Sequence, residues 1–154
     1  MQRKAFSMVE LVFVIVVIGI LAAVAIPKLA VTRDDAEIAK AKNTVAAVRN
    51  SVAAKRQKQI MSGQIAAGIS KLSSESGYNK PIFDAFDEDT SDPVLAYPLT
   101  SCKNENDRAC WYTGDKVNYT YKMPVSGSVD FNVTNNSRFD CTEPSSDNCK
   151  LLTQ

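Results

Sequence analysis

Histidine is absent from the 154 residues of this chain. Its absence removes the commonest general base, the usual transition-metal ligand and the ordinary proton switch near neutral pH. The chain also lacks a glycine-rich phosphate loop, a nucleophile paired with a base, and a pair of catalytic carboxylates. We therefore expect a protein that is not an enzyme.

Net charge is almost absent as well, because 18 Lys and Arg stand against 17 Asp and Glu. A net charge of +1 leaves no global polycation that could wrap nucleic acid. Eight of the basic residues nevertheless fall between residues 28 and 62, together with three acids. Charges spread around a helix are typical of a solvated face. Nucleic acid is therefore neither expected nor excluded as a partner.

Polar side chains are missing from Leu11 to Ile26, a run of sixteen residues. Residues 6–9 extend this run, with only Ser7 and Glu10 interrupting it. A helix over residues 6–26 would measure roughly 31 Å at about 1.5 Å per residue, which is the thickness of the hydrocarbon core of a bilayer. Its Leu, Ile, Val and Phe residues supply about −4 to −7 kcal/mol of insertion free energy, more than a carboxylate near one end costs. The segment is predicted to span a membrane.

Two conventional targeting segments also fit this run. A secretory signal peptide would explain the basic start and the Ala23-Val24-Ala25 triplet, although its apolar core is normally shorter and contains no acid. A plain signal anchor would use Arg3 and Lys4 to hold the N-terminus in the cytoplasm. Neither accounts for Glu10, which lies inside the apolar segment.

The stretch around Glu10 carries a family signature. It reads KAFSMVELVFVIVVIGILAAVAIP, which is a basic leader, a Phe, a Glu four residues later, a long apolar run and a Pro. This stretch resembles the N-terminal signature of type IV pilins and type II secretion pseudopilins. The resemblance implies a leader over residues 1–5, a cut between Ala5 and Phe6 by prepilin peptidase, and methylation of the new Phe6 amine. Ala5 stands where the family usually has Gly, and both residues are small.

Glu10 is the residue to which the resemblance assigns assembly. An ionisable side chain within a membrane needs a partner, and the resemblance implies the α-ammonium of Phe6 on a neighbouring subunit. At about 4 Å and an effective dielectric near 20, that attraction is roughly 4 kcal/mol before desolvation is subtracted. Because an unpaired acid among apolar helices is costly, the pair would set the register of each new subunit. The alternative is a Glu10 that reaches the membrane interface without a partner.

Residues 28–62 are predicted to continue the helix, because no Gly or Pro occurs from residue 28 to residue 60. Pro27 lies at the junction, where its missing N–H and its ring predict a kink. An apolar stripe follows at seven-residue spacing, with two residues filling the i+3 positions: Val31, Ile38, Val45 and Val52, then Ala41 and Val48. A stripe this narrow favours packing against a small sheet, and coiled-coil pairing is the alternative.

The polar half, residues 63–154, is predicted to form an antiparallel sheet after a loop region. Gly and Ser residues break the helical pattern, with a short helical piece expected around residues 65–72. Strand signals predict a meander of about three strands, over residues 111–113, 117–123 and 128–134. Alternation places Tyr119 and Tyr121 on the face toward the helix. The tail after residue 137 is expected to be irregular.

Acidic residues crowd the segment that follows the loops, at Asp84, Asp87, Asp89 and Asp92. Carboxylate oxygens suit Ca²⁺, which some pseudopilins hold near their sheet, so these four residues are calcium candidates. Their order lacks the alternating ligands, the central Gly and the distant Glu of an EF-hand loop. A solvated acidic loop is the favoured interpretation, and no cofactor is expected.

Four cysteines fall into two pairs of equal spacing, Cys102 with Cys110 and Cys141 with Cys149. Seven intervening residues are too many within a zinc-binding pair, and no C-x-x-C redox motif is present. The predicted membrane topology places this half outside the cytoplasm, where disulfides persist. Four cysteines allow three connectivities, of which we favour the one with two local bonds.

Together with the resemblance, these features predict an α+β, pilin-like fold: a long N-terminal helix on a small antiparallel sheet, with disulfides in the C-terminal region. Its segments would be a leader, a filament-core helix, an amphipathic continuation of that helix and an extracytoplasmic head, over residues 1–5, 6–27, 28–62 and 63–154.

The resemblance implies a structural subunit, a pilin or pseudopilin, of a type IV pilus or type II secretion-type filament. It would cross the bacterial inner membrane once with its head in the periplasm, and then enter a periplasmic or extracellular filament. Its partners would be other pilins or pseudopilins, prepilin peptidase, the inner-membrane assembly platform and membrane lipid. The alternative is a minor pilin that acts as a binding module in DNA uptake or adhesion.

Overall fold

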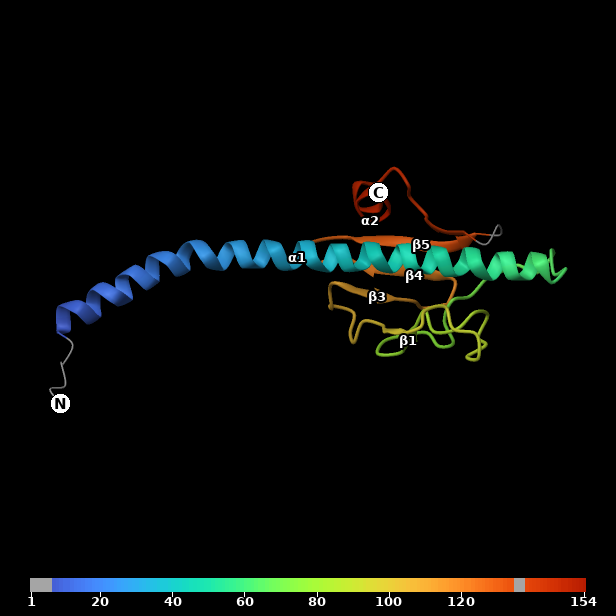
Figure 1. The fold of residues 1–154 in the computed structure, drawn as a ribbon, viewed down its shortest axis with the longest axis horizontal. Helices are drawn as coiled ribbons and strands as arrows, with labels where there is room; N and C mark the ends of the chain where they lie inside the picture. Colours follow the sequence, from blue (N-terminus) through green and yellow to red (C-terminus); the bar gives the residue numbers. More distant parts are fainter. Residues whose placement is uncertain (1–6, 135–137) are drawn as a thin grey trace. The chain divides into compact units, whose positions relative to one another are not determined.

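The computed structural model describes residues 7–134 and 138–154 and shows an α+β protein (Figure 1). Its first element, α1, is a single helix over Met8–Met61. Contacts divide the chain into two units, one ending at Ala36 and the other beginning at Glu37. The first part of α1 therefore belongs to the first unit and its last part to the second.

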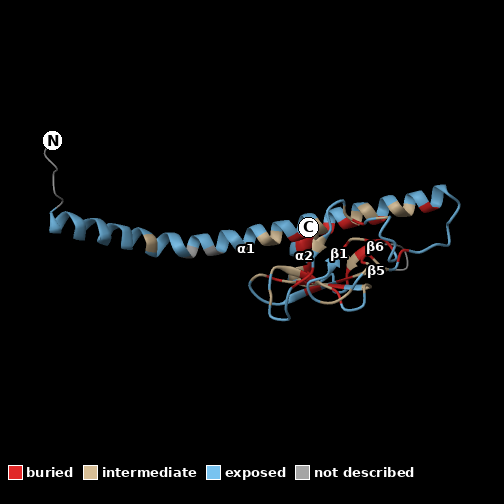
Figure 2. Cartoon of the chain, turned by 90° about the horizontal axis from the view of Figure 1, so that it is seen from below, coloured by how far each residue is buried: buried red, intermediate tan, exposed pale blue. Residues whose placement is uncertain are grey.

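The part of α1 that lies in the first unit buries almost none of its described side chains. Nearly all of its described side chains up to Ala36 are exposed (Figure 2). The exposed large apolar side chains from Met8 to Val31 have between 38% and 83% of their surface accessible. An 18-residue window of α1 has a mean hydropathy of 3.1, so the helix is long and apolar enough to cross a membrane.

The second unit combines the last part of α1 with two sheets and a short C-terminal helix. The larger sheet has four antiparallel strands in chain order: β3 (Cys110–Tyr112), β4 (Asn118–Lys122), β5 (Ser128–Thr134) and β6 (Arg138–Cys141). β1 (Pro81–Ile82) pairs with β2 (Leu99–Thr100), also antiparallel. The short helix α2 (Asp147–Thr153) follows β6.

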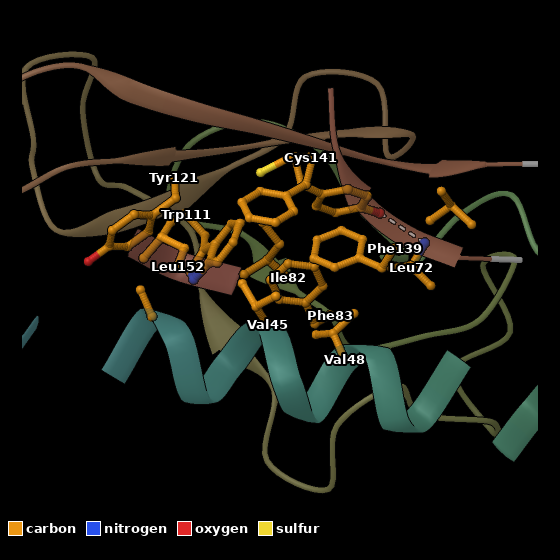
Figure 3. Close-up of a cluster of buried hydrophobic side chains, with 14 of the residues drawn as sticks. Val45, Val48, Leu72, Ile82, Phe83, Trp111, Tyr121, Phe139, Cys141 and Leu152 are labelled. Carbon is orange, nitrogen blue, oxygen red and sulfur yellow. Dashed lines mark hydrogen bonds between the residues drawn. The ribbon is translucent and has the colours of Figure 1, made fainter. Parts of the chain in front are cut away.

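One face of the four-stranded sheet is buried because apolar residues alternate along its strands. These residues form an aromatic cluster that packs on α1 (Figure 3): Trp111, Tyr119, Tyr121, Phe131 and Phe139 from the sheet, with Val45, Val48 and Val52 from α1. The predicted orientation of Tyr119 and Tyr121 toward the helix is confirmed. The Tyr121 hydroxyl also donates a hydrogen bond to the Glu37 carbonyl of α1 at 3.1 Å.

Phe83 fills the centre of this core from the segment after β1. Its ring stacks on Tyr119 with centroids 5.0 Å apart and meets Trp111 edge-on at 5.2 Å. Its backbone has a φ of 57°, an uncommon value for a bulky residue, and its N–H donates to the buried Ser73 hydroxyl at 3.0 Å. Packing around a fully buried ring holds this conformation.

The buried stripe of α1 begins later than the seven-residue periodicity suggests. Ala41, Val45, Val48 and Val52 are buried, and Ile38 packs against the same core. Val31, in the first unit, is 61% exposed. Packing of the helix on a small sheet is therefore confirmed from Ile38 onward.

Three predictions about the polar half need correction. The tail is not irregular, because β6 places Phe139 and Cys141 inward and Ser146 caps α2 by accepting a hydrogen bond from the Cys149 backbone N–H at 3.2 Å. The meander has four strands rather than three, and the β1–β2 pair was not expected. No helix forms over residues 65–72, where the Arg56 guanidinium binds backbone carbonyls instead.

Candidate functional site

Ser7 starts α1 by capping its first turn. Its side-chain oxygen accepts a hydrogen bond from the Glu10 backbone N–H at 3.2 Å, and its carbonyl accepts one from the Leu11 N–H at 3.2 Å. The Ser7-x-x-Glu10 spacing is that of a capping box, in which an acid lies near the unpaired N–H groups of the first turn. Sequence reasoning missed this feature, although the spacing was its signal. Glu10 thus occupies the first turn of a capped helix.

The structure describes some of the predicted site residues and not others. The Glu10 side chain is exposed, and its carboxylate has no hydrogen bond or ion pair within residues 7–134 and 138–154. Ala5 and Phe6, the predicted cleavage and methylation residues, lie outside the described residues. Pro27 lies within α1, which is helical on both sides of it. The cut, the methylation and the kink stay predictions.

The exposed apolar segment of α1, residues 8–31, presents apolar side chains whose contact with water is unfavourable. Monomeric soluble proteins rarely leave contiguous apolar patches larger than a few hundred Å². From Leu11 to Ile26 the side chains are apolar all round the helix, which is typical of a membrane span or of a helix buried among others. The segment therefore needs lipid or other apolar helices around it.

The last part of α1 has a second exposed face, on the side away from the sheet. Residues 43–49 and 50–56 read NTVAAVR and NSVAAKR, which is a seven-residue repeat. In each repeat the first Val is buried, whereas the Asn and both Ala residues are exposed. This Asn–Ala face consists of Asn43, Ala46, Ala47, Asn50, Ala53 and Ala54, and it carries no charge and only short side chains. Sequence reasoning followed the buried stripe and missed this face, for which the repeat was the signal.

The four calcium candidates do not converge on one point. Each is bound to a different neighbour by hydrogen bonds or an ion pair: Asp84 to Ser74, Asp87 to Ser70 and Lys71, Asp89 to Ser91, and Asp92 to Lys55. Among the residues that the structure describes, no three His, Cys, Asp or Glu side chains are grouped to hold a metal ion. Three of these carboxylates instead fasten the loop to other segments, and that of Asp89 binds within the loop.

Glu88, in the same loop, bridges two lysines. Its carboxylate lies 2.6 Å from the Lys116 ammonium and 3.1 Å from the Lys71 ammonium. The hydrogen bond from Lys116, followed by the one from Lys71, lowers the pKa of Glu88 below its usual value. The bridge ties the acidic loop to residues on both sides of it in the sequence.

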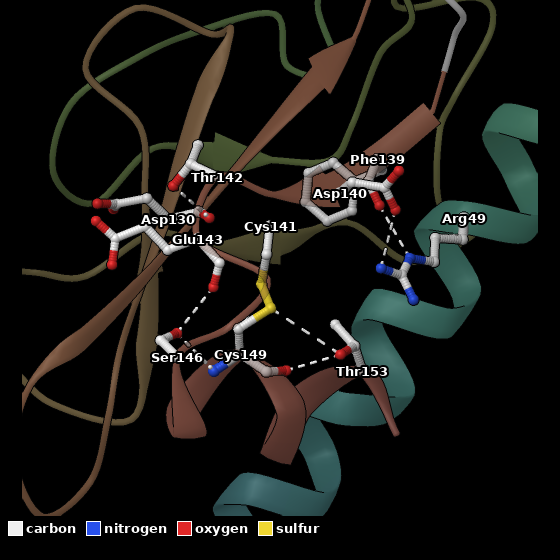
Figure 4. Close-up of a disulfide and its surroundings, with 10 residues drawn as sticks. All are labelled: Arg49, Asp130, Phe139, Asp140, Cys141, Thr142, Glu143, Ser146, Cys149 and Thr153. Carbon is white, nitrogen blue, oxygen red and sulfur yellow. Dashed lines mark hydrogen bonds and ion pairs between the residues drawn. A yellow bond between two sulfur atoms is a disulfide. The ribbon is translucent and has the colours of Figure 1, made fainter.

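The cysteines are joined as Cys102–Cys110 and Cys141–Cys149, the local connectivity favoured from the sequence. The first bond closes the loop before β3, and the second joins β6 to α2 (Figure 4). Arg49 of α1 lies beside the second bond, where it donates to the Phe139 carbonyl at 2.9 Å and to Asp140 at 3.1 Å. The C-terminal region is therefore held to the sheet covalently and to α1 by a charged side chain.

The hollows on the second unit are small and lined by groups that already have partners. One of about 170 Å³ lies between α1 and the sheet, beside Trp111 and Tyr121. Another of about 410 Å³ lies over Arg49 and Asp140, and there Asp140 also pairs with Arg138 at 3.1 Å. These lining residues form ion pairs and packing contacts.

A comparison with known proteins bears on the resemblance to type IV pilins. The chain is 45% identical over 53 residues to the type IV narrow pilus major component PilA5 of Thermus thermophilus. The resemblance to type IV pilins is confirmed. The match covers 34% of this chain and 46% of that pilin, so it spans about half of the relative's length. No protein-family model matches the chain, and no solved structure matches it.

The type IV pilin resemblance agrees with the described structure. A long apolar N-terminal helix on antiparallel sheets, with two disulfides in the C-terminal region, fits a membrane-anchored pilin. The relative is described as a major component of a pilus.

Proposed function

We propose that this protein is a structural subunit, a pilin or pseudopilin, of a type IV pilus or type II secretion-type filament. The observation that supports this most is the exposed apolar segment of α1 in a chain that resembles type IV pilins. Before assembly, lipid of the inner membrane covers this segment. In the filament, the same segment of neighbouring subunits covers it.

Processing prepares the N-terminus for assembly. Prepilin peptidase cuts the peptide bond between Ala5 and Phe6, and the freed Phe6 amine is methylated. Ser7 then becomes the second residue of the mature chain, and its role as the cap of α1 supports a helix that begins directly after the new terminus. The amine is thereby kept within a few residues of Glu10.

Glu10 selects the register of each incoming subunit. Its carboxylate lies on an exposed turn of an otherwise apolar segment, and it has no partner among the described residues. When lipid is replaced by apolar helices, an unpaired carboxylate costs several kcal/mol. A position that brings the Phe6 ammonium of one subunit to the Glu10 carboxylate of the next removes that cost.

The Asn–Ala face supports close packing of the last part of α1 as well. Short side chains allow two helix backbones to approach each other, and uncharged ones avoid repulsion between identical subunits. Two of the charged residues within the repeat are occupied elsewhere, since Arg49 binds Asp140 and Lys55 binds Asp92. Contacts between subunits can therefore continue from the apolar segment onto the head.

The head is proposed to lie in the periplasm before assembly. Two disulfides support an oxidising compartment, because such bonds are rare where thiols are kept reduced. The inner-membrane assembly platform would then extract the subunit from lipid into a periplasmic or extracellular filament.

The decisive experiment replaces the acid without changing its size. Glu10→Gln should still insert and be cut before Phe6, but the yield of sheared filaments should fall by about tenfold or more, the factor that corresponds to about 1.4 kcal/mol. Glu105→Gln, which changes an exposed acid of the head, is the matched control and should assemble normally. Mass spectrometry of the filaments should find a methylated Phe6 as the first residue. Normal assembly of Glu10→Gln, or filaments that keep residues 1–5, would overturn the proposal.

A further inference from the structure

The outer face of the four-stranded sheet carries a motif that filament assembly does not use. Asn-x-Ser/Thr, with x other than Pro, is the acceptor tripeptide of N-linked glycosylation. Asn118-Tyr119-Thr120 lies in β4 and Asn132-Val133-Thr134 in β5. We propose that Asn132 is an N-glycosylation site, so that the outer face of the sheet carries a glycan. A third tripeptide, Asn135-Asn136-Ser137, lies outside the described residues and is not part of the proposed site.

The register of the sheet brings the two acceptor asparagines together. Asn118 and Asn132 are direct cross-strand partners, so their side chains leave the sheet on the same face. This is the outer face, because the alternating residues Tyr119, Phe131 and Val133 are buried on the other side. Asn118 is exposed and Asn132 is partly exposed. A glycan on either residue would extend into solvent without disturbing the core.

Asn132 accommodates a glycan in the folded sheet better than Asn118 does. The Asn118 side-chain amide donates to Asp115 at 2.7 Å, and its backbone N–H binds the same carboxylate at 2.7 Å. The Asn132 side chain makes no hydrogen bond with the rest of the described chain. In the folded sheet, a glycan on Asn118 would therefore crowd its bonds to Asp115, whereas a glycan on Asn132 displaces no hydrogen bond, which favours Asn132.

The sheet also dictates when transfer takes place. β5 lies between two strands, and Asn132 is paired with Asn118 on one side and with Asp140 on the other. A transferase that binds the tripeptide as an extended chain cannot reach it once these ladders have formed. Transfer therefore precedes closure of the sheet, while the head crosses the membrane. This timing rests on the extracytoplasmic head of the proposed function.

The reaction transfers one glycosyl group from a polyprenyl diphosphate-linked oligosaccharide, the co-reactant of the membrane transferase. The Asn132 side-chain nitrogen attacks C1 of the first sugar, and a C–N bond forms as the bond between C1 and the phosphate oxygen breaks. The diphosphate carrier leaves with the electron pair, and the amide nitrogen gives up one proton to a base of the transferase. No oxidant or reductant is needed.

Peptide mapping by mass spectrometry of the protein from its native cells tests this assignment. The wild type should yield a glycopeptide containing Asn132, and N-glycosidase should leave aspartate at that position. Asn132→Gln and Thr134→Ala should abolish the glycopeptide, whereas Thr134→Ser, which keeps the hydroxyl, and Asn118→Gln should retain it.

An unmodified Asn132 in the wild type, a glycan only on Asn118 or Asn135, or a glycopeptide that survives Thr134→Ala would overturn the proposal. Because transfer precedes folding, a folding defect in Thr134→Ala does not by itself remove the glycan, and Thr134→Ser isolates the role of the hydroxyl. Filament yield is scored in the same cells. Filaments with a bare Asn132 would refute only the glycosylation, and a glycosylated protein that never assembles would refute only the filament role.

Discussion

The two units of the chain differ in where their apolar surface is buried. In the first unit, described apolar side chains such as Phe13 and Ile26 are 69% and 67% exposed, whereas Val48, Phe83 and Tyr119 in the second are fully buried. Burial stabilises by about 25 cal/mol per Å² of apolar surface wherever it occurs. The second unit gains this free energy within its own chain, but the first can gain it only from lipid or from apolar surfaces of other chains. On the proposed function, anchoring and assembly are therefore alternative ways to bury the same segment.

Removal of the first unit should have the largest effect on the protein. A chain beginning at Glu37 keeps the core of the head and both disulfides, so it should be soluble without detergent and unfold cooperatively. The full-length protein should partition into membranes or detergent. Sedimentation and near-ultraviolet circular dichroism compare the two. An aggregated or loosely packed head would show that its core depends on the first unit.

Two phenylalanines, one in each unit, test the difference in burial at single residues. Phe139→Ala removes a ring that is 1% exposed, and it should lower the free energy of unfolding of the head by about 3–5 kcal/mol. Phe13→Ala removes a ring that is 69% exposed and should change it by less than about 0.5 kcal/mol. Denaturant unfolding of the detergent-solubilised proteins, followed by tryptophan fluorescence, measures both. Equal losses would contradict independent stabilisation of the two units.

The disulfides should matter less than the core, and only to the head. Each bond joins cysteines eight positions apart, and a loop of this size is worth about 2.5 kcal/mol in the chain-entropy model. Replacing Cys141 and Cys149 together by Ala should cost about that much, with membrane insertion unchanged. The pair Cys102 and Cys110 serves as an equal-loop comparison, and a loss of insertion in either double variant would contradict the expectation. Non-reducing peptide mapping of the wild type checks the pairing.

The sequence predicts the fold best where one physical signal dominates. Sixteen apolar residues in a row predict the long helix, and strict alternation at Tyr119 and Tyr121 predicts which face of β4 is buried. Cysteine spacing favours the observed pairing because equal short loops are easy to close. In each case the local pattern and the tertiary contacts agree.

Prediction fails where tertiary contacts decide the outcome. β6 has only four residues, and its alternation at Phe139 and Cys141 becomes meaningful only beside β5. The acidic loop reads as a group of oxygen ligands, yet its carboxylates point to separate donors that lie 2 to 37 positions away in sequence. Among the proposed assembly residues, the motif supplies Glu10 and Phe6, but on the proposed function the partner that each would contact belongs to another subunit. No pattern within one chain places that contact.

The smallest expected effect concerns the acid that fastens the loop of the head. The hydrogen bond from Lys116, and then the one from Lys71, lowers the pKa of Glu88 in the folded head, while the unfolded value stays at about 4.3. A carboxylate with a lowered folded pKa stabilises the fold above the unfolded pKa, and this stabilisation is lost as the pH falls through the folded pKa. Glu88→Gln should therefore be slightly less stable than the wild type at about pH 7 and equal to it below the folded pKa.

Urea unfolding of both proteins at about pH 7 and at about pH 3 measures this difference, and added salt should shrink it at the higher pH because the carboxylate is exposed. Glu143→Gln, which changes an exposed acid outside the ion pairs of the described chain, is the matched control. If the gap between Glu88→Gln and the wild type were the same at both pH values, the ionised bridge to Lys71 and Lys116 would contribute nothing to the head. The acidic loop would then be held by packing and by its neutral hydrogen bonds alone.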